Sequence, residues 1–271
     1  MSDRPSARIL AITNQKGGVG KTTTAINLGA ALVGLGQRVL IIDLDPQGNA
    51  STGLGIFPRD RVITTYELLH DGAPLASVIR KTATEGLDIA PATTDLSSTD
   101  VELGHHENRV FLLKEALANE TLASYDHVLI DSPPSLSLLT VNALVASHAV
   151  LVPLQAEFFA LEGLSQLMLT IRDVRETANP NLRIEGIVLT MFDQRNNLSL
   201  QVEADARATL GDLVFQTRIP RNVRLGEAPS FGVSALSYDP TSKGSQAYQD
   251  LATELLSRRS PRKETADGQQ T

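Results

Sequence analysis

Residues 14–27 read NQKGGVGKTTTAIN and place a lysine, Lys21, at the end of a run of small residues. The apolar stretch 7–13, ARILAIT, precedes this segment and predicts a buried strand, and the residues after Lys21 predict a helix. A loop between a strand and a helix presents backbone N–H groups that form a cradle for phosphate oxygens. The glycines that let this backbone approach an anion without a Cβ clash are Gly17, Gly18 and Gly20.

Side chains of the same segment predict the chemistry around the phosphates. Lys21 supplies a positive charge to the β- and γ-phosphates of a nucleotide, Thr22 offers its hydroxyl to Mg²⁺, and Thr23 donates to the α-phosphate. Val19 completes the loop. The alternative is a glycine-rich turn before an ordinary helix. A second lysine, Lys16, stands five residues before Lys21, and a phosphate cradle of this kind does not need it.

Two aspartates follow a second predicted strand, RVLIIDL at 38–44. Pro46 cannot continue the strand ladder, so the chain leaves the sheet after Asp45. Ligands collect at the carboxyl ends of parallel strands, and we therefore expect Asp43 and Asp45 beside the phosphate loop. Alternation along the strand sends both side chains to the same side. Asp43 is the better candidate for a supporting or structural role.

A third predicted strand, HVLIDS at 127–132, closes on Asp131. Four buried residues followed by an aspartate are the layout of a Walker B segment, in which the carboxylate holds Mg²⁺ through a water. The alternative is that Asp131 caps a predicted helix at 136–147.

The elements that position these residues alternate along the chain. Near-continuous Val, Ile and Leu runs indicate strands buried on both faces, and amphipathic segments lie between them. This alternation predicts an α/β fold with a single doubly wound, mostly parallel sheet and helices on both faces. One domain is expected over 1–257, followed by a disordered polar tail at 258–271. Further strands are expected at 149–154 and 184–192, and helices at 21–35, 108–119, 161–177, 198–210 and 244–257.

Composition excludes several classes of protein. The 271 residues contain no Cys, so disulfides, thiolate metal sites and cysteine nucleophiles are excluded. The first residues lack the apolar core of a signal peptide, and no apolar run is long enough to span a bilayer. These features predict a cytoplasmic protein. The formal net charge is −7, but the acidic excess lies before residue 181, and the last third of the chain is neutral overall.

The phosphate loop departs from the strict P-loop pattern, because Gln15 stands where that pattern has its first glycine. The sequence that remains, KGGVGKT, resembles the deviant Walker A motif of the ParA/MinD family of ATPases. Four further segments are similar to the chromosome-partitioning (ParA, or Soj) type of this family, and the resemblance covers about residues 7–257. These segments are DLDPQGNASTGLG (43–55), DSPPSLSLLTVNAL (131–144), LQAEFFALEGL (154–164) and IPRNVRLGEAPSFG (219–232).

The resemblance implies roles for three residues of the phosphate site. Lys16 matches the signature lysine that reaches across a face-to-face homodimer to the partner's ATP, as an arginine finger does in trans. Asp45 matches the catalytic aspartate that orients the attacking water, and Lys21 the lysine of the cradle. The resemblance also implies adenine recognition near Met191 and by Pro220, Arg221 and Asn222. Hydrolysis is then Mg²⁺-dependent and slow for the protein alone.

Basic residues of the last third suggest contacts with DNA. Arg218, Arg221 and Arg224 recur at every third position, and Arg195 and Lys243 lie in the same part of the chain. No recognition-helix motif accompanies them, so we expect non-specific, salt-sensitive contacts with double-stranded DNA. The alternative is a set of solvated arginines.

By resemblance, the function is an ATP-dependent switch for chromosome or plasmid segregation. An ATP-bound dimer on the nucleoid binds DNA, and a ParB-like centromere-binding protein stimulates hydrolysis. One alternative is an ATPase that positions another cargo. A MinD-like membrane-associated regulator of cell division is a weaker alternative, because the tail SRRSPRKETADGQQT has no amphipathic pattern.

Overall fold

The computed structural model describes residues 7–157 and 160–258. Its centre is an eight-stranded sheet of order β3-β4-β2-β5-β1-β6-β7-β8. Every strand pair is parallel except β3 with β4. The strands are β1 (Arg8–Ile12), β2 (Val39–Asp43), β3 (Arg80–Lys81), β4 (Leu87–Ala90), β5 (His127–Asp131), β6 (Ala149–Gln155), β7 (Arg183–Phe192) and β8 (Val214–Pro220).

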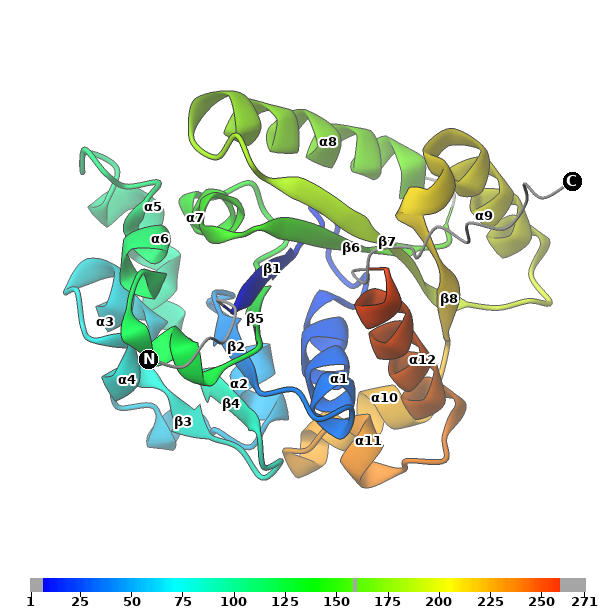
Figure 1. Cartoon of the computed structure of the whole chain (residues 1–271), viewed down its shortest axis with the longest axis horizontal. Helices are drawn as coiled ribbons and strands as arrows, with labels where there is room; N and C mark the ends of the chain where they lie inside the picture. The colour runs from blue at the N-terminus through cyan, green and yellow to red at the C-terminus, as the bar shows by residue number, and fades with distance from the viewer. Residues whose placement is uncertain (1–6, 158–159, 259–271) are drawn as a thin grey trace, which may run out of the picture.

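Helices cover both faces of this sheet (Figure 1). The longer ones are α1 (Lys21–Gly34), α7 (Leu138–Ala146), α8 (Ala160–Thr177), α9 (Asn197–Leu210) and α12 (Lys243–Ser257). The shorter ones are α2 (Asn49–Gly53), α3 (Thr65–His70), α4 (Leu75–Val78), α5 (Thr99–Glu102), α6 (Leu112–Leu117), α10 (Val223–Glu227) and α11 (Ala235–Tyr238). In Figure 1, α1 and α12 lie on one face of the sheet, and α7 and α8 lie on the other.

Two hydrophobic cores result, because the central strands are apolar on both sides. One core packs α1 and α12 against the sheet through residues such as Leu28 and Leu251. The other packs α6, α7 and α8 through residues such as Leu113 and Leu167. Neighbouring strand positions point to opposite cores: Leu10 of β1 belongs to the first and Ala11 to the second.

The predicted fold class is confirmed, and the five predicted strands are all present with ends within one or two residues. The helix predicted at 108–119 is shorter, since α6 spans only Leu112–Leu117. Arg258, the first residue of the predicted tail, closes α12 and donates to the backbone of Asp212 and Val214. The rest of that tail, 259–271, lies outside the described residues.

Candidate functional site

The loop between β1 and α1 has the backbone that a phosphate cradle requires. Gly18 and Gly20 have φ angles of 75° and 88°, in the left-handed region that favours glycine. The Thr190 hydroxyl of β7 donates to the Val19 carbonyl at 2.8 Å. Buried Asn14 donates to the Pro153 carbonyl at 2.8 Å. The loop is therefore fastened to two neighbouring strands.

The two lysines of the loop point in different directions. Lys21 is buried, and its Nζ donates to the Lys16 carbonyl at 3.2 Å, so this lysine turns back over its own loop. Burial lowers the pKa of Lys21, and the charges of Asp131 and Asp45 oppose that shift. The Lys16 side chain is 41% exposed, and its Nζ lies 2.7 Å from Oε2 of Glu157, just beyond β6. Lys16 thus lies at the surface, and Lys21 is the lysine that lies over the phosphate cradle.

Asp43 is the last residue of β2 and Asp45 follows two residues later, and their carboxylates have different partners. Asp43 is fully buried and accepts hydrogen bonds from the Ser51 N–H (2.9 Å), the Ser51 hydroxyl (2.6 Å) and the Asp45 N–H (3.1 Å). Burial raises the pKa of Asp43 to about 6, against the effect of these donors. Within the described residues, the Asp45 carboxylate accepts a single hydrogen bond, from the Gln47 N–H at 3.0 Å. Asp43 therefore organises the turn, as predicted for a structural carboxylate, and Asp45 is available to a ligand.

Asp131, the last residue of β5, is a fully buried carboxylate. Both of its oxygens are inaccessible to solvent, and neither accepts a hydrogen bond from the described residues. Burial and the neighbouring Asp43 raise its pKa well above the ordinary value. The Thr22 hydroxyl lies close enough to favour the ionised form, although it does not reach hydrogen-bond geometry. The alternative, in which Asp131 caps the following helix, is not what the structure has: the carboxylate that accepts from the Leu138 N–H of α7, at 2.8 Å, is that of Asp100.

This environment fits a divalent cation. A buried carboxylate with two unpaired oxygens beside a hydroxyl is a hard-oxygen donor set of the kind Mg²⁺ prefers. Within residues 7–157 and 160–258, no cluster of three His, Cys, Asp or Glu side chains is arranged to hold a metal. The donors on this protein are therefore few, and nucleotide phosphates and water must complete the coordination, as is usual for Mg²⁺.

A pocket of about 200 Å³ adjoins the loop. All four residues predicted for adenine recognition line it, together with Gly20 and Thr23 of the loop: Met191, Pro220, Arg221 and Asn222. The sequence analysis did not identify the remaining lining residues, which are Thr190, Ile219, Leu225, Gly226 and Tyr248. The buried Tyr248 of α12 forms a hydrogen bond of 3.1 Å with Thr24 of α1, which fixes one wall of the pocket.

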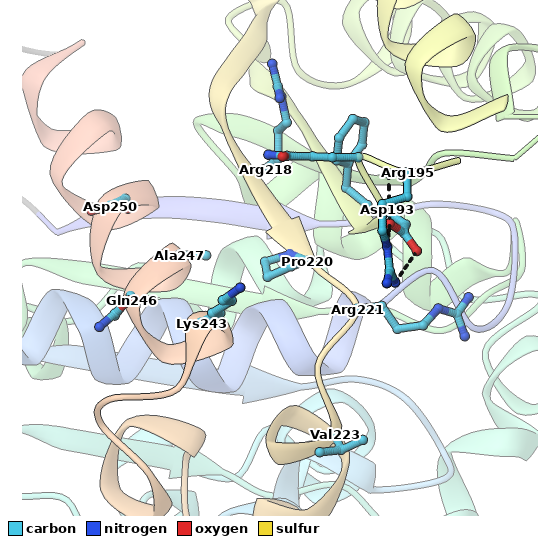
Figure 2. Close-up of a pocket in the computed structure, with 12 residues that line it drawn as sticks. Asp193, Arg195, Arg218, Pro220, Arg221, Val223, Lys243, Gln246, Ala247 and Asp250 are labelled. Atoms are coloured by element: carbon cyan, nitrogen blue, oxygen red, sulfur yellow. Dashed lines mark hydrogen bonds and ion pairs between the residues drawn. The ribbon is translucent and has the colours of Figure 1, made fainter. Parts of the chain in front are cut away.

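A larger groove, of about 830 Å³, runs between β8, the segment after β7 and α12 (Figure 2). Four of the five predicted DNA contacts line it: Arg195, Arg218, Arg221 and Lys243. In Figure 2, Lys243 extends from α12 toward Pro220, and the side chain of Arg221, the residue after β8, points away from α12. Two acids, Asp193 and Asp250, also line the groove. The four basic residues outnumber them, so the lining is basic overall.

Three of the predicted DNA-contacting arginines already have acidic partners. Arg195 pairs with Asp193 at 3.0 Å, and Arg218 pairs with Glu203 of α9 at 2.8 Å. Arg224 does not line the groove and lies between two carboxylates, Glu227 at 2.7 Å and Asp239 at 3.3 Å. These arginines are therefore held in place rather than freely solvated.

The fold and the phosphate site together define a class of protein. A doubly wound parallel sheet, a left-handed glycine loop carrying Lys21, and aspartates at the ends of β2 and β5 define a P-loop ATPase with a deviant Walker A motif. A family model described as an AAA domain matches residues 7–184.

Similar proteins narrow this class. The chromosome partitioning protein ParA of Caulobacter vibrioides is 57% identical over 267 residues, covering 98% of this chain and all of that protein. The sporulation initiation inhibitor protein Soj of Bacillus subtilis is 51% identical over 248 residues, with 92% and 98% covered. The chain belongs to the ParA/Soj family of chromosome-partitioning ATPases.

A solved structure supports the same architecture. The crystal structure of a Mycobacterium smegmatis protein named cobyrinic acid a,c-diamide synthase, with bound ADP and magnesium, is 39% identical and has a TM-score of 0.81. It covers 92% of this chain, which in turn covers 94% of that one. The predicted family, fold and ATPase activity are thereby confirmed, whereas the roles assigned to individual site residues stay predictions.

Proposed function

We propose that this ATPase is a nucleotide-driven switch for DNA segregation. ATP closes two copies face to face, and the dimer binds double-stranded DNA without sequence preference. Hydrolysis to ADP and phosphate, stimulated by a ParB-like centromere-binding protein, releases the dimer. The observation that carries the proposal is the placement of Lys16, which is half-exposed and directed to Glu157 instead of the cradle. A second copy is the natural source of a phosphate for this lysine.

A small number of groups in the phosphate site bind the nucleotide and promote its hydrolysis. The loop N–H groups and Lys21 hold the phosphates, and Lys16 of the other copy adds positive charge as negative charge develops in the transition state. Asp45 orients the attacking water. Thr22 and Asp131 hold Mg²⁺, which neutralises charge on the β- and γ-phosphate oxygens when bound. A relative with bound ADP and magnesium supports the choice of a magnesium-bound adenine nucleotide as the ligand.

Base recognition and DNA binding use adjacent surfaces. Adenine occupies the pocket of Met191, Pro220, Arg221 and Asn222. DNA phosphates contact the groove arginines and Lys243, with Arg224 as a further contact. A monomer presents only a few cations, and a dimer doubles them. Because each phosphate contact contributes to affinity and to its salt dependence, dimerisation converts weak binding into useful binding to the nucleoid.

A membrane-positioning role has less support. None of the helices within the described ranges is both long and apolar enough to cross a membrane. The apolar face of α12 is buried against the sheet through Leu251, Ala252 and Leu255, so it does not form a free amphipathic surface. An ATPase that positions another cargo would share every feature above, and binding to a ParB-like protein distinguishes the two.

Substitution of Lys16 tests the proposal. We expect Lys16→Ala to bind ATP as a monomer with affinity near that of the wild type, because Lys21 holds the phosphates. Dimers, DNA binding and hydrolysis should be lost, with a rate decrease of about 10³-fold or more, as for charges supplied in trans. Analytical ultracentrifugation with ATP and Mg²⁺ measures the dimer. Lys114→Ala, at an exposed lysine of α6, is the matched control. ATP-dependent dimers of Lys16→Ala would refute the in-trans role.

A further inference from the structure

Arg61 makes an unusually complete set of hydrogen bonds with the turn that follows β2. Its Nε donates to the Ile56 carbonyl at 3.0 Å, and its Nη1 donates to the Ala92 carbonyl at 2.9 Å. Its Nη2 donates to the Gly48 carbonyl at 3.1 Å and to the Thr52 hydroxyl at 2.7 Å. One planar guanidinium thus joins three separate stretches of backbone, which a lysine cannot do with the same geometry.

The turn held in this way is the one that carries Asp45. The Gly48 N–H donates to the Asp45 carbonyl at 2.8 Å, and the Gln47 N–H donates to the Asp45 carboxylate at 3.0 Å. Gly48 has a φ of 60°, and a Cβ at this position would collide with Nη1 of Arg61. Arg61 therefore occupies space that only a glycine leaves open, directly behind the turn.

The other side of the turn is fastened independently. Asp43 accepts two hydrogen bonds from Ser51, and the Ser51 hydroxyl in turn accepts the Ala92 N–H at 3.0 Å. Asp43 holds Asp45 and Ser51, and Arg61 holds Gly48 and Thr52, so the two side chains fasten residues 45–52 at interleaved positions. Both also connect the turn to Ala92, two residues after β4: Arg61 directly and Asp43 through the Ser51 hydroxyl.

We propose that Arg61 is a positioning residue for ATP hydrolysis, which acts by fixing the 45–52 turn and with it the carboxylate of Asp45. This inference rests on the proposed role of Asp45. It predicts that loss of Arg61 lowers the rate of the chemical step while nucleotide affinity is retained, because the phosphate loop has its own anchors at Thr190 and Asn14.

The test is the first turnover of ATP hydrolysis by the full-length protein, mixed with Mg²⁺ and at least an equal concentration of ATP so that both copies of a dimer carry nucleotide. Misplacement of a catalytic group by about 1 Å costs on the order of 100-fold in rate. We expect a decrease of about that size for Arg61→Ala and about 10-fold for Arg61→Lys, with ATP affinity changed less than about threefold. Guanidinium added to Arg61→Ala should restore part of the rate.

Controls separate positioning from loss of structure. Arg59→Ala changes an arginine two residues away whose single ion pair among the described residues is a 3.7 Å contact with Asp60 and whose side chain is 84% exposed. It should hydrolyse ATP as the wild type does. Gly48→Ala should reproduce the Arg61→Ala defect from the opposite side, since the new methyl group displaces the guanidinium. The melting temperature of Arg61→Lys, the milder variant, verifies that the protein is folded at the assay temperature.

The double variant Asp45→Ala/Arg61→Lys decides whether Arg61 acts through Asp45. If it does, the double variant is no slower than Asp45→Ala alone. Two outcomes would overturn the role of Arg61 and leave the proposed function intact. One is a double variant whose loss in activation free energy is the sum of the two single losses. The other is a wild-type rate for the Arg61 variants when Asp45→Ala is inactive. A wild-type rate for Asp45→Ala would instead overturn the catalytic assignment of Asp45 and this inference together.

Discussion

The phosphate edge of the sheet and the basic groove hold their charges in opposite ways. At the phosphate edge, Lys21 and Asp131 are buried, and the Asp131 oxygens accept no hydrogen bond from the described residues. In the groove, Arg195 and Arg218 lie nearer to solvent, and each pairs with an acid of the same chain. At the phosphate edge, a ligand must supply the partners that the buried charged groups lack. In the groove, an arginine must leave its acidic partner before it can bind a DNA phosphate.

This difference predicts how strongly each region binds. Charges in a buried environment interact more strongly than charges screened by water, so the phosphate edge is suited to tight and specific binding of one ligand. Exposed pairs contribute little and weaken with salt. The groove is therefore suited to many weak contacts whose sum depends on how many copies of the protein are joined.

The largest effect should follow the loss of charge at the phosphate edge. Asp131→Asn keeps the shape of the side chain but removes the anionic oxygen that suits Mg²⁺. Substitutions in the outer shell of metal sites already cost 10–100-fold in affinity or activity, and we expect a decrease of at least about 100-fold in Mg²⁺-dependent ATP hydrolysis. Titration of the rate with Mg²⁺ measures it. An unchanged magnesium requirement would remove Asp131 from the site.

The same substitution should stabilise the protein without ligand. The folded state raises the pKa of Asp131, so ionisation costs folding free energy at every pH above its unfolded value, about 3.9. Wild-type stability therefore decreases as pH rises through the shifted range, and Asp131→Asn removes that dependence. At pH 7 we expect a higher free energy of unfolding for Asp131→Asn, because the amide carries no charge that burial penalises. Urea unfolding at pH 5 and pH 7 tests this, and equal slopes with pH for both proteins would contradict it.

A smaller effect is expected for a single cation of the groove. Lys243→Ala should weaken non-specific DNA binding by the ATP-bound dimer several-fold and equally for all sequences. The plot of log affinity against log salt concentration should become shallower by about one unit for each phosphate that the protein no longer neutralises. Fluorescence anisotropy with two unrelated duplexes measures both quantities, with Lys114→Ala as the control. An unaltered salt dependence would place DNA elsewhere on the protein.

The smallest effect concerns the acids that restrain the arginines. Glu227→Gln removes the nearer of the two partners of Arg224 and should strengthen DNA binding by about twofold, in line with the small contribution of an exposed ion pair. Glu176→Gln, at an exposed acid of α8 that pairs with Arg172, should leave affinity unchanged. Weaker binding by Glu227→Gln would show that Arg224 needs this acid for its position.

The sequence predicted the parts of the fold whose signal is local. Strands buried on both faces are continuous apolar runs, and all five such runs were identified. β4 was missed because it has only four residues and contains Asp88, which is buried against Lys81 and Tyr125. β8 was missed because the sequence VFQTRIP mixes polar and apolar residues at the margin of the sheet.

For the candidate site as well, only residues with a local sequence pattern could be predicted. The glycine loop and its lysines are contiguous, so their pattern can be recognised in the sequence. Thr190, Tyr248 and Arg61 reach the site from distant elements, and each is an ordinary residue in its local context. Only the sheet order, which places β7 beside β6 and α12 against α1, brings the first two to the loop. Arg61 becomes conspicuous only when the fold gathers three backbone carbonyls around its guanidinium.

Arg221 lines both the pocket beside the phosphate loop and the basic groove. If nucleotide fills the pocket and DNA the groove, as we propose, this shared side chain can couple the two equilibria, and such linkage is reciprocal by thermodynamic necessity. If DNA binds one orientation of this guanidinium preferentially, DNA changes the affinity for nucleotide. Nucleotide then changes the affinity for DNA by the same factor. The equilibrium dissociation constant of labelled ATP, measured with and without a duplex, would thus report on DNA binding in the groove.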